Sequence, residues 1–450
     1  MDTELKVFFY GGVGKVTGAN FLLESKSTKI LIDCGLTQGN KEDQELNPKS
    51  FSYNPSEIDF LFVTHAHIDH IGRIGKLVKD GFKGTIYSID ATKDLAVFML
   101  ADALKVMSYG NKEPLYGADD VEKALSLWKT FSYHENITAG EFSVFAKDAG
   151  HILGSAIYEF THKGSGKKIA FTGDLGNTPS PLIRDTENVS DVDYLVMESV
   201  YGDRNHENRE QRKDSLRDVI KKVTARGGVL IVPVFSLEKT QALLYELDNF
   251  VESGEISSVP VFLDSPLGIK LTSVYGNYGK YFNAGVQKEI KSADEIFNFP
   301  KLEMTLSMDD SNDIRKTNPP MIIISSSGMS EGGRVNMHEK NFLSDKRNAI
   351  LFIGYQVSGS LGRMIKEGSK SIVIDKKRVK VNAEVISIDG YSSHKDSDGL
   401  LDFVANCGEK LKKVFVVMGE PKSSFFLAQK IKDNLDVESV VPEAGKEYSL

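Results

Sequence analysis

One short stretch of this sequence constrains its fold more than any other. The segment Asp59–Thr64 has the apolar character of a buried strand, and it runs directly into a group of metal-ligating residue types: His65, His67, Asp69 and His70. Offsets of 2, 4 and 5 residues from His65 do not share one face of a helix. We therefore expect a bent loop at the end of this strand, which turns these side chains toward a common point.

The chemistry of this cluster points to metal ions. Imidazole and carboxylate groups are good ligands for zinc and its neighbours among the divalent metals. Because one ion rarely takes every ligand from so short a loop, we expect more than one ion. Three of the chain's nine histidines fall in this single turn, which argues against a merely solvated polar loop.

Further ligands follow other predicted strands. His151 lies among small residues in Gly150–Ala156, and Asp174 follows the apolar strand Lys168–Thr172. Taken alone, His151 has the alternative of a satisfied core histidine, and Asp174 that of a turn-forming aspartate. Together with the first cluster they are predicted ligands, and a carboxylate at position 174 is able to bridge two ions.

The strand and helix pattern divides the chain. Its beginning is rich in short strands, whereas apolar strands alternate with helices after Val229, which is typical of a parallel sheet covered on both faces. The β-rich character returns near Ser371. We predict an α/β protein in which residues 1–202 and 371–450 form one domain and residues 203–370 form an inserted one.

Composition narrows the class of protein. The hydrophobic content of 40% and charged content of 26% suit an ordinary soluble chain, and no apolar run approaches the roughly 20 residues of a membrane span. The N-terminus lacks the pattern of a signal peptide, and Cys34 and Cys407 are too few for a disulfide framework. We therefore expect a cytoplasmic protein without a membrane partner. The net charge of −8 excludes a wholly basic nucleic-acid surface but not a local basic one.

The ordered set of these residues resembles a known family. Asp33, the histidine cluster, His151 and Asp174 resemble the metallo-β-lactamase superfamily, whose fold is an αββα sandwich. Later motifs resemble the β-CASP insertion: Glu198–Arg204, Val232–Ser236, Asp264–Pro266, Ser326–Met329, Gly354–Gln356, Gly359–Arg363 and Tyr391–Asp396. The resemblance covers nearly the whole chain, which is similar to the compact bacterial members. It implies an αββα sandwich with an inserted parallel α/β domain.

The resemblance also implies roles for single residues. β-CASP proteins are RNA- and DNA-processing nucleases, and they include ribonuclease J and the endonuclease of messenger-RNA 3′-end formation. By this resemblance, His65, His67 and His151 hold one zinc ion, Asp69 and His70 hold a second, and Asp174 bridges both. Asp33 orients the ligands from behind.

The implied chemistry is hydrolysis of a phosphodiester by a hydroxide that bridges the two metals. Asp69 takes part as a catalytic ligand. His394 contacts the scissile phosphate, and Glu198 orients His394.

One position departs from the family pattern. Met418 stands where the family has a histidine ligand to the second metal, and a thioether is a poor ligand for zinc. Either the second ion loses a protein ligand and takes water instead, or it binds weakly, or the chain binds nucleic acid but cuts it poorly. Met418 also has the ordinary alternative of packing in the core.

Loops in the inserted domain are candidates for phosphate binding. By resemblance, the residues that line phosphates are Ser326, Ser327, Gly328, Gly359, Ser360 and Arg363. Ordinary turn chemistry between a strand and a helix is an equally good explanation for each.

The predicted function is that of a zinc-dependent nuclease with two ions per chain, acting on single-stranded RNA. A nucleic-acid-binding protein with weak cleavage and a small-molecule metallohydrolase are the alternatives. The sequence leaves open whether DNA is also a substrate, whether cleavage is internal or from an end, and whether the chain forms a homodimer.

Overall fold

The computed structural model describes residues 5–39, 41–109, 113–206, 211–291, 295–357 and 359–450. These residues form two compact units. Unit 1 contains Met1–Asn205 and Ser393–Leu450, and unit 2 contains His206–Ser392. Among the described residues, no helix has both the length and the apolar character needed to cross a membrane.

Unit 1 is built on two sheets. In the described part of the chain, one seven-stranded sheet has the order β22-β1-β2-β3-β4-β5-β6, and another has the order β21-β20-β11-β10-β9-β8-β7. The strands of the first sheet are β1 (Lys6–Phe9), β2 (Phe21–Glu24), β3 (Lys29–Ile32), β4 (Phe60–Phe62), β5 (Thr85–Ile89), β6 (Trp128–Phe131) and β22 (Glu447–Ser449). Those of the second are β7 (Asn136–Ala139), β8 (Phe142–Asp148), β9 (Ala156–His162), β10 (Lys168–Phe171), β11 (Tyr194–Met197), β20 (Lys413–Val416) and β21 (Glu438–Val440).

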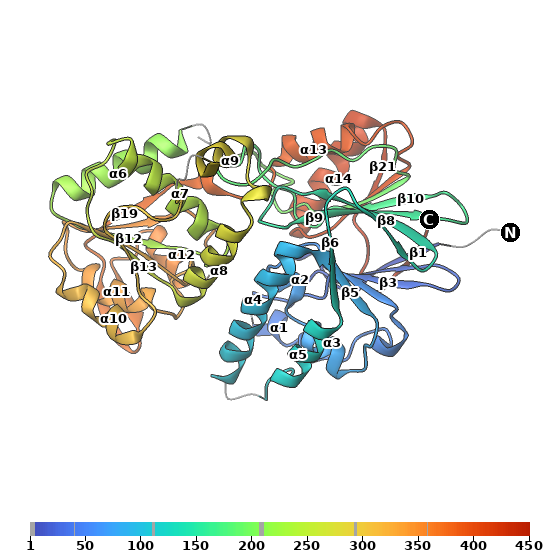
Figure 1. Ribbon diagram of the computed structural model, residues 1–450, viewed down its shortest axis with the longest axis horizontal. Helices are drawn as coiled ribbons and strands as arrows, with labels where there is room; N and C mark the ends of the chain where they lie inside the picture. Colours follow the sequence, from blue (N-terminus) through green and yellow to red (C-terminus); the bar gives the residue numbers. More distant parts are fainter. Residues whose placement is uncertain (1–4, 40, 110–112, 207–210, 292–294, 358) are drawn as a thin grey trace. The chain divides into compact units, whose positions relative to one another are not determined.

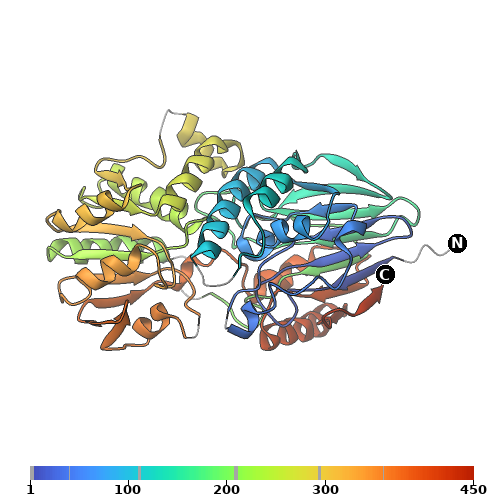
Figure 2. The same cartoon turned by 90° about the horizontal axis from the view of Figure 1, so that it is seen from below.

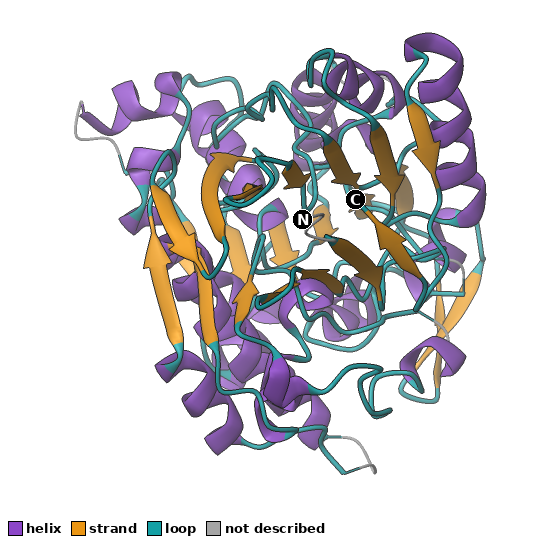
Figure 3. Cartoon of the chain, turned by 90° about the vertical axis from the view of Figure 1, so that its right-hand side faces the viewer, coloured by secondary structure: helices purple, strands orange, loops and turns teal. Residues whose placement is uncertain are grey.

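Helices cover the outer sides of these sheets (Figures 1 and 3). One side carries α1 (Lys41–Gln44), α2 (Ile68–Ile71), α3 (Ile74–Lys79), α4 (Asp90–Ser108) and α5 (Ala118–Ser126), and the other carries α13 (Ser397–Ala405) and α14 (Pro421–Leu435). The apolar residues Leu400, Phe403 and Leu427 of α13 and α14 pack with the second sheet in one buried core. Unit 1 is therefore the αββα sandwich that the sequence predicts.

The strand directions bring the polar loops to one end of each sheet. Strands β3, β4 and β5 run parallel, so their carboxyl ends share an edge. In the second sheet β10, β11 and β20 are parallel, and β8 runs the same way because β9 is antiparallel to both β8 and β10. The loops that follow β3, β4, β8, β10, β11 and β20 carry the predicted ligands and their neighbours.

Unit 2 contains a parallel sheet with helices packed around it (Figure 2). Its strands, in the order β14-β13-β15-β12-β16-β19 over the described residues, are β14 (Leu302–Met304), β13 (Val261–Asp264), β15 (Met321–Ser325), β12 (Val229–Pro233), β16 (Ala349–Phe352) and β19 (Glu384–Ser387). The helices are α6 (Arg212–Ala225), α7 (Lys239–Glu252), α8 (Pro266–Asn277), α9 (Ala284–Lys291), α10 (Met308–Asp313), α11 (Val335–Phe342) and α12 (Leu361–Lys366). A separate hairpin pairs β17 (Ser371–Ile374) with β18 (Lys377–Lys380).

The second boundary of unit 2 differs from the one expected from sequence. We expected the inserted domain to end at residue 370, whereas the compact unit extends to Ser392. The reason is β19, which pairs in parallel with β16 as the edge strand of the unit 2 sheet. The short, β-rich sequence of β19 does not indicate which of the sheets this strand joins.

A buried aspartate fixes the carboxyl ends of the unit 2 strands. Asp264, at the end of β13, accepts hydrogen bonds from Thr305 Oγ1 (2.6 Å), Ser311 Oγ (2.6 Å), Arg334 Nη1 (2.7 Å) and His338 Nε2 (2.7 Å). Burial alone raises its pKa, but these donors more than offset that and lower the pKa to about 2. Asp264 therefore stays ionised throughout the physiological range, and its donors are held in place.

Glu339 on α11 generates a prediction about stability. It is fully buried, and burial raises its pKa from 4.5 to about 8, although the nearby Ser330 hydroxyl partly opposes this. The unfolded chain loses this proton near pH 4.5, whereas the folded chain keeps it to about pH 8. The free energy of unfolding should therefore fall as pH rises between these values, by an amount on the order of a few kcal/mol.

Glu339→Gln should remove this fall, and urea denaturation at pH 5 and pH 8 measures it. Glu331→Gln is the matched control because Glu331 is exposed, and it should keep the wild-type pH dependence. An unchanged slope in Glu339→Gln would contradict the assignment.

Candidate metal centre

The ligand loops of unit 1 are packed backbone against backbone. The loop after β3 approaches α2 so closely that a side chain on Gly35 would lie 1.5 Å from the carbonyl oxygen of Asp69. Backbone hydrogen bonds from Cys34 N to His70 O (2.8 Å) and from Ala19 N to Asp69 O (2.9 Å) hold this approach. The expected bent loop is present, and it ends in one helical turn, α2, which carries Asp69 and His70.

Four side chains converge as a set of ligands. His67 Nδ1 lies 3.0 Å from His65 Nε2 and 3.2 Å from His151 Nε2. Asp174 Oδ2 lies 3.5 Å from His65 Nε2 and 3.6 Å from His151 Nε2. Ligand atoms about 2.0–2.2 Å from one zinc ion at tetrahedral angles lie about 3.3–3.6 Å apart. The separations in this group fit a single tetrahedral ion.

The protonation of these histidines suits a ligand role. Burial lowers the pKa of His65 and His151 well below the usual range, and neighbouring histidines lower it further. A neutral imidazole keeps the lone pair that a metal ion needs. His151 Nδ1 lies 3.2 Å from the carbonyl oxygen of Ser393, which leaves Nε2 to face the other ligands.

Orphaned atoms mark a second position beside the first. His70 Nε2 and Asp174 Oδ1 are buried and face each other at 3.4 Å as an ion pair, and neither makes a well-formed hydrogen bond with the described residues. Asp69 Oδ2 lies 3.9 Å from His70 Nε2, and burial raises the pKa of Asp69 to about 6. Buried polar atoms without partners are costly. A cation between His70 Nε2 and Asp174 Oδ1, with Asp69 beside His70, would satisfy both atoms, and a second ion at this position stays a prediction.

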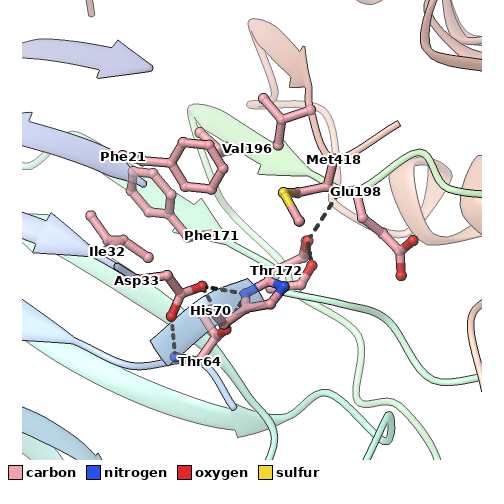
Figure 4. A pocket seen from close by; sticks show the side chains of 12 residues that line it. Phe21, Ile32, Asp33, Thr64, His70, Phe171, Thr172, Val196, Glu198 and Met418 are labelled. Carbon is pink, nitrogen blue, oxygen red and sulfur yellow. Dashed lines mark hydrogen bonds and ion pairs between the residues drawn. The ribbon is translucent and has the colours of Figure 1, made fainter. Parts of the chain in front are cut away.

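Asp33 supports this second position from behind (Figure 4). Its carboxylate accepts hydrogen bonds from Thr64 N and Thr64 Oγ1, both at 2.8 Å, and lies 2.7 Å from His70 Nδ1. Burial lowers the pKa of His70, but the charges of Asp174 and Asp33 more than offset it and raise the pKa well above the usual range. The two carboxylates therefore favour a positive charge on this ring, with Nδ1 facing Asp33 and Nε2 facing Asp174. A metal ion bound at Nε2 would take the place of the proton there.

His394 and Glu198 form a pair at the edge of this centre. His394 Nδ1 lies 3.2 Å from both carboxylate oxygens of Glu198 and 4.0 Å from Asp174 Oδ2. Glu198 is fully buried and also accepts a hydrogen bond from Leu175 N at 2.6 Å. The backbone of His394 forms a bridge with Gly176, two residues beyond Asp174. The structure thus brings together the two residues predicted to act as a pair.

Met418 lies next to the second position, beside His70, and its thioether sulfur is a poor ligand for zinc. It lines a small cavity with His70, Asp33 and Glu198 (Figure 4). Its side chain packs over Gly12, where an added Cβ would lie 2.4 Å from the Met418 sulfur. The backbone at Met418 has a φ of 49°, a region in which histidine is enriched and methionine is uncommon.

The predicted phosphate-binding residues all lie in unit 2 and have local partners. Ser326 Oγ contacts Ser265 Oγ at 2.9 Å, and Ser327 Oγ accepts from Met329 N at 3.3 Å. Ser360 caps α12 by accepting from Arg363 N at 3.2 Å, and Arg363 pairs with Glu367 at 2.6 Å. Gly328 approaches the backbone of Phe235, and Gly359 has a φ of 86°. Turn chemistry accounts for these residues, and RNA contact by them stays a prediction.

Two supporting groups are not among the residues predicted from sequence. Thr64 joins Asp33 to the histidines, since its hydroxyl also lies 3.1 Å from His65 Nδ1. The Ser393 carbonyl orients His151. The position of Thr64, directly before His65, was the one available signal, whereas a backbone carbonyl gives no signal in a sequence.

Comparisons with known proteins identify the family of this chain. Residues 13–226 match the family model of the metallo-β-lactamase superfamily, residues 240–365 that of the Beta-Casp domain, and residues 378–442 that of the Zn-dependent metallo-hydrolase RNA specificity domain. The chain is 33% identical over 425 residues to Ribonuclease TTHA0252 of Thermus thermophilus, covering 94% of this chain and 95% of that protein. This chain belongs to the β-CASP family of metallo-β-lactamase-fold nucleases.

The chain is also similar to two further proteins. Transcription termination factor FttA of Methanosarcina mazei is 32% identical over 455 residues, which cover 97% of this chain and 70% of that protein. A crystal structure of a protein of unknown function from Enterococcus faecalis V583 matches with a TM-score of 0.59 at 14% identity, covering 99% of this chain and 100% of that one. The latter likeness shows the shared fold alone.

Asp33→Asn should weaken metal binding at the second position of this β-CASP centre. The amide keeps the shape but loses the charge that holds the His70 proton, and such losses typically cost about 10–100-fold in metal affinity. Competitive titration with a chelator measures the affinity. Asp59→Asn is the control, since Asp59 also accepts a backbone hydrogen bond, from Lys29 N, and it should bind metal as the wild type does. Equal affinities for both variants would contradict this role.

Met418→His should raise the amount of metal that the protein retains. Histidine suits the left-handed backbone at this position and adds an imidazole to the cavity that Met418 lines together with His70. Elemental analysis after dialysis against a chelator measures the retained metal. Met418→Leu fills the space without a ligand atom and should retain as much as the wild type. The interpretation of Met418 is wrong if Met418→His and Met418→Leu retain the same amount.

Proposed function

We propose that this protein is a zinc-dependent ribonuclease that hydrolyses phosphodiester bonds in single-stranded RNA. The observation that carries the proposal is that three groups of side chains lie next to one another. The first group is His65, His67, His151 and Asp174. His70 and Asp69 lie beside it, and so does the pair of His394 and Glu198. Support also comes from the ribonuclease named among the relatives and from the RNA specificity model that matches residues 378–442.

The metal ions would be held as described above, with Asp174 offering one oxygen to each position. When bound, they supply an activated water at neutral pH and neutralise charge on the phosphate. Two ions per chain form part of the proposal, and the neutral thioether of Met418 makes the second the weaker one.

The chain's own residues would perform the remaining steps. Glu198 holds Nδ1 of His394 and keeps that ring in one orientation, and Nε2 would contact the phosphate or pass a proton to the leaving oxygen. Asp33 and Thr64 keep the ligand loop from moving during turnover. The proposal places the protein in the cytoplasm, where RNA is present and where the free, buried Cys34 and Cys407 stay reduced.

His394→Ala should reduce cleavage of a labelled single-stranded RNA by about 10²–10⁴-fold, the usual loss when a general acid is removed. Its metal content should stay close to that of the wild type, because His394 is not a ligand of the first group. His134→Ala is the matched control, since His134 pairs with Glu187 in unit 1 and should leave cleavage unchanged. The proposal fails if fully metal-loaded wild-type protein leaves the RNA intact.

Met418 favours a second candidate function, that of an RNA-binding protein with weak cleavage. A second position with three protein ligands would be occupied only at high metal concentration. Titrating zinc into the metal-depleted protein separates the two candidates: RNA binding without cleavage at any zinc concentration favours the second one. Parallel assays with single-stranded DNA and a thioester substrate test the nucleic-acid class and the small-molecule alternative.

A further inference from the structure

The β17–β18 hairpin of unit 2 concentrates positive charge in a protein whose net charge is −8. Its cations are exposed, and in the part of the chain that the structure describes no ion pair or side-chain hydrogen bond joins them to another residue: Lys370, Lys376, Lys377, Arg378 and Lys380. The hairpin's acid, Asp375, pairs with Lys340 of α11 at 2.5 Å. The nearby Glu367 pairs with Arg363 at 2.6 Å. The cations of the hairpin are therefore not neutralised by neighbouring acids.

The two faces of the hairpin differ in character. Ile372, Ile374 and Val379 are buried in the apolar core of unit 2, which fixes the hairpin on that unit. On the opposite face, Val373 pairs with Arg378, and Ser371 pairs with Lys380. Arg378 and Lys380 point the same way because side chains alternate along a strand, about 7 Å apart at this spacing. This spacing suits successive phosphates of an extended nucleic-acid strand. Val373, which is 60% exposed, lies between the charges.

The turn of the hairpin keeps a lysine at a backbone cost. Asp375 has a φ of 48° and Lys376 a φ of 64°, so both central residues of this two-residue turn are left-handed. Turns of this kind strongly favour glycine or asparagine at the second position. Lysine gains no local contact there, since it is exposed and makes no recorded side-chain interaction among the described residues. Lys376 therefore places a positive charge at a turn position whose backbone conformation favours glycine or asparagine.

The ordinary explanation for lysines on a small sheet is protection of its edges against pairing with other chains. That explanation accounts for charge along the strands but not for a lysine in the turn, where no edge is exposed. An acidic protein partner would also be attracted to such charge. The family assignment and the proposed ribonuclease activity make RNA the polyanion that this chain must bind.

We infer that the outer face and turn of the β17–β18 hairpin bind the phosphate backbone of single-stranded RNA, as a surface additional to the metal centre. This inference rests on the proposed function for the identity of the ligand. Binding would be independent of sequence, because phosphate contacts carry no base information, and steeply dependent on salt.

The first test measures binding, so that it does not depend on cleavage. The hairpin variant Lys376→Gln, Lys377→Gln, Arg378→Gln and Lys380→Gln is compared with a control in which exposed lysines of unit 1 are changed: Lys26→Gln, Lys83→Gln, Lys123→Gln and Lys129→Gln. Both lose the same charge. The full, metal-loaded chain carries His394→Ala in each case, so that the probe stays intact. The probe is a fluorescein-labelled oligouridylate of about 30 nucleotides, long enough to exceed the roughly 4–16 nucleotides of one single-strand site.

We expect the hairpin variant to bind this probe at least about tenfold more weakly than the control at 0.1 M salt. The slope of log K against log salt should be shallower by about 2–3, since each single-strand phosphate contact contributes about 0.7. Equal affinities and slopes in the two variants would overturn the inference. The lysines would then serve to protect the sheet edges or to bind a protein.

A single substitution gives a second, independent test. Lys376→Gly suits the turn, so the Tm should be unchanged or higher, while RNA affinity falls by about two- to fivefold, in keeping with the loss of one phosphate contact. A folded variant with unchanged affinity counts against the inference. If wild-type protein binds RNA through the hairpin but never cleaves it, the proposed function fails while this inference stands.

Discussion

The metal centre depends on one buried carboxylate, that of Asp33. It is fully buried and has a φ of 58°, in the left-handed region that aspartate tolerates. A charge in such a place is costly unless it is matched. Here it receives Thr64 N, Thr64 Oγ1 and the ring of His70. These contacts tie the end of β3 to the end of β4, so the same bonds that neutralise the charge also set where the ligand loop begins.

The residues of the candidate centre could be proposed from sequence because they share a position. Each predicted ligand follows a strand, and parallel strands deliver their carboxyl ends to one edge. The sequence does not reveal which backbone groups orient the ligands, because every residue has them. The Ser393 carbonyl that orients His151 is an example. Met418 illustrates a related limit. Its identity signals a change at the second position, but only the structure shows that Gly12 provides the space for its side chain.

The same reasoning explains why the fold class was predicted, and why the compact unit ends at Ser392 and not near residue 370. Continuous apolar strands separated by helices indicate a parallel sheet wherever they occur. An edge strand such as β19 is short and half exposed, so its sequence does not say which sheet it joins. In unit 2, Asp264 has a place like that of Asp33, at the end of a strand with donors around it, but its partners include Arg334 and hydroxyl groups. With its charge already satisfied, it has no need of a metal ion.

The origin of the ligands on two different sheets has a consequence for how the protein unfolds. His67 follows β4 of the first sheet, and His151, 84 residues later, follows β8 of the second. In an unfolded chain the local cluster at His65–His70 is available, but His151 and Asp174 reach it only by closing long loops. An ion bound by His67, His151 and Asp174 together would link the two sheets. Metal affinity and the packing of the sandwich would then be linked by mass action, so that separating the sheets and releasing the ion become one cooperative event.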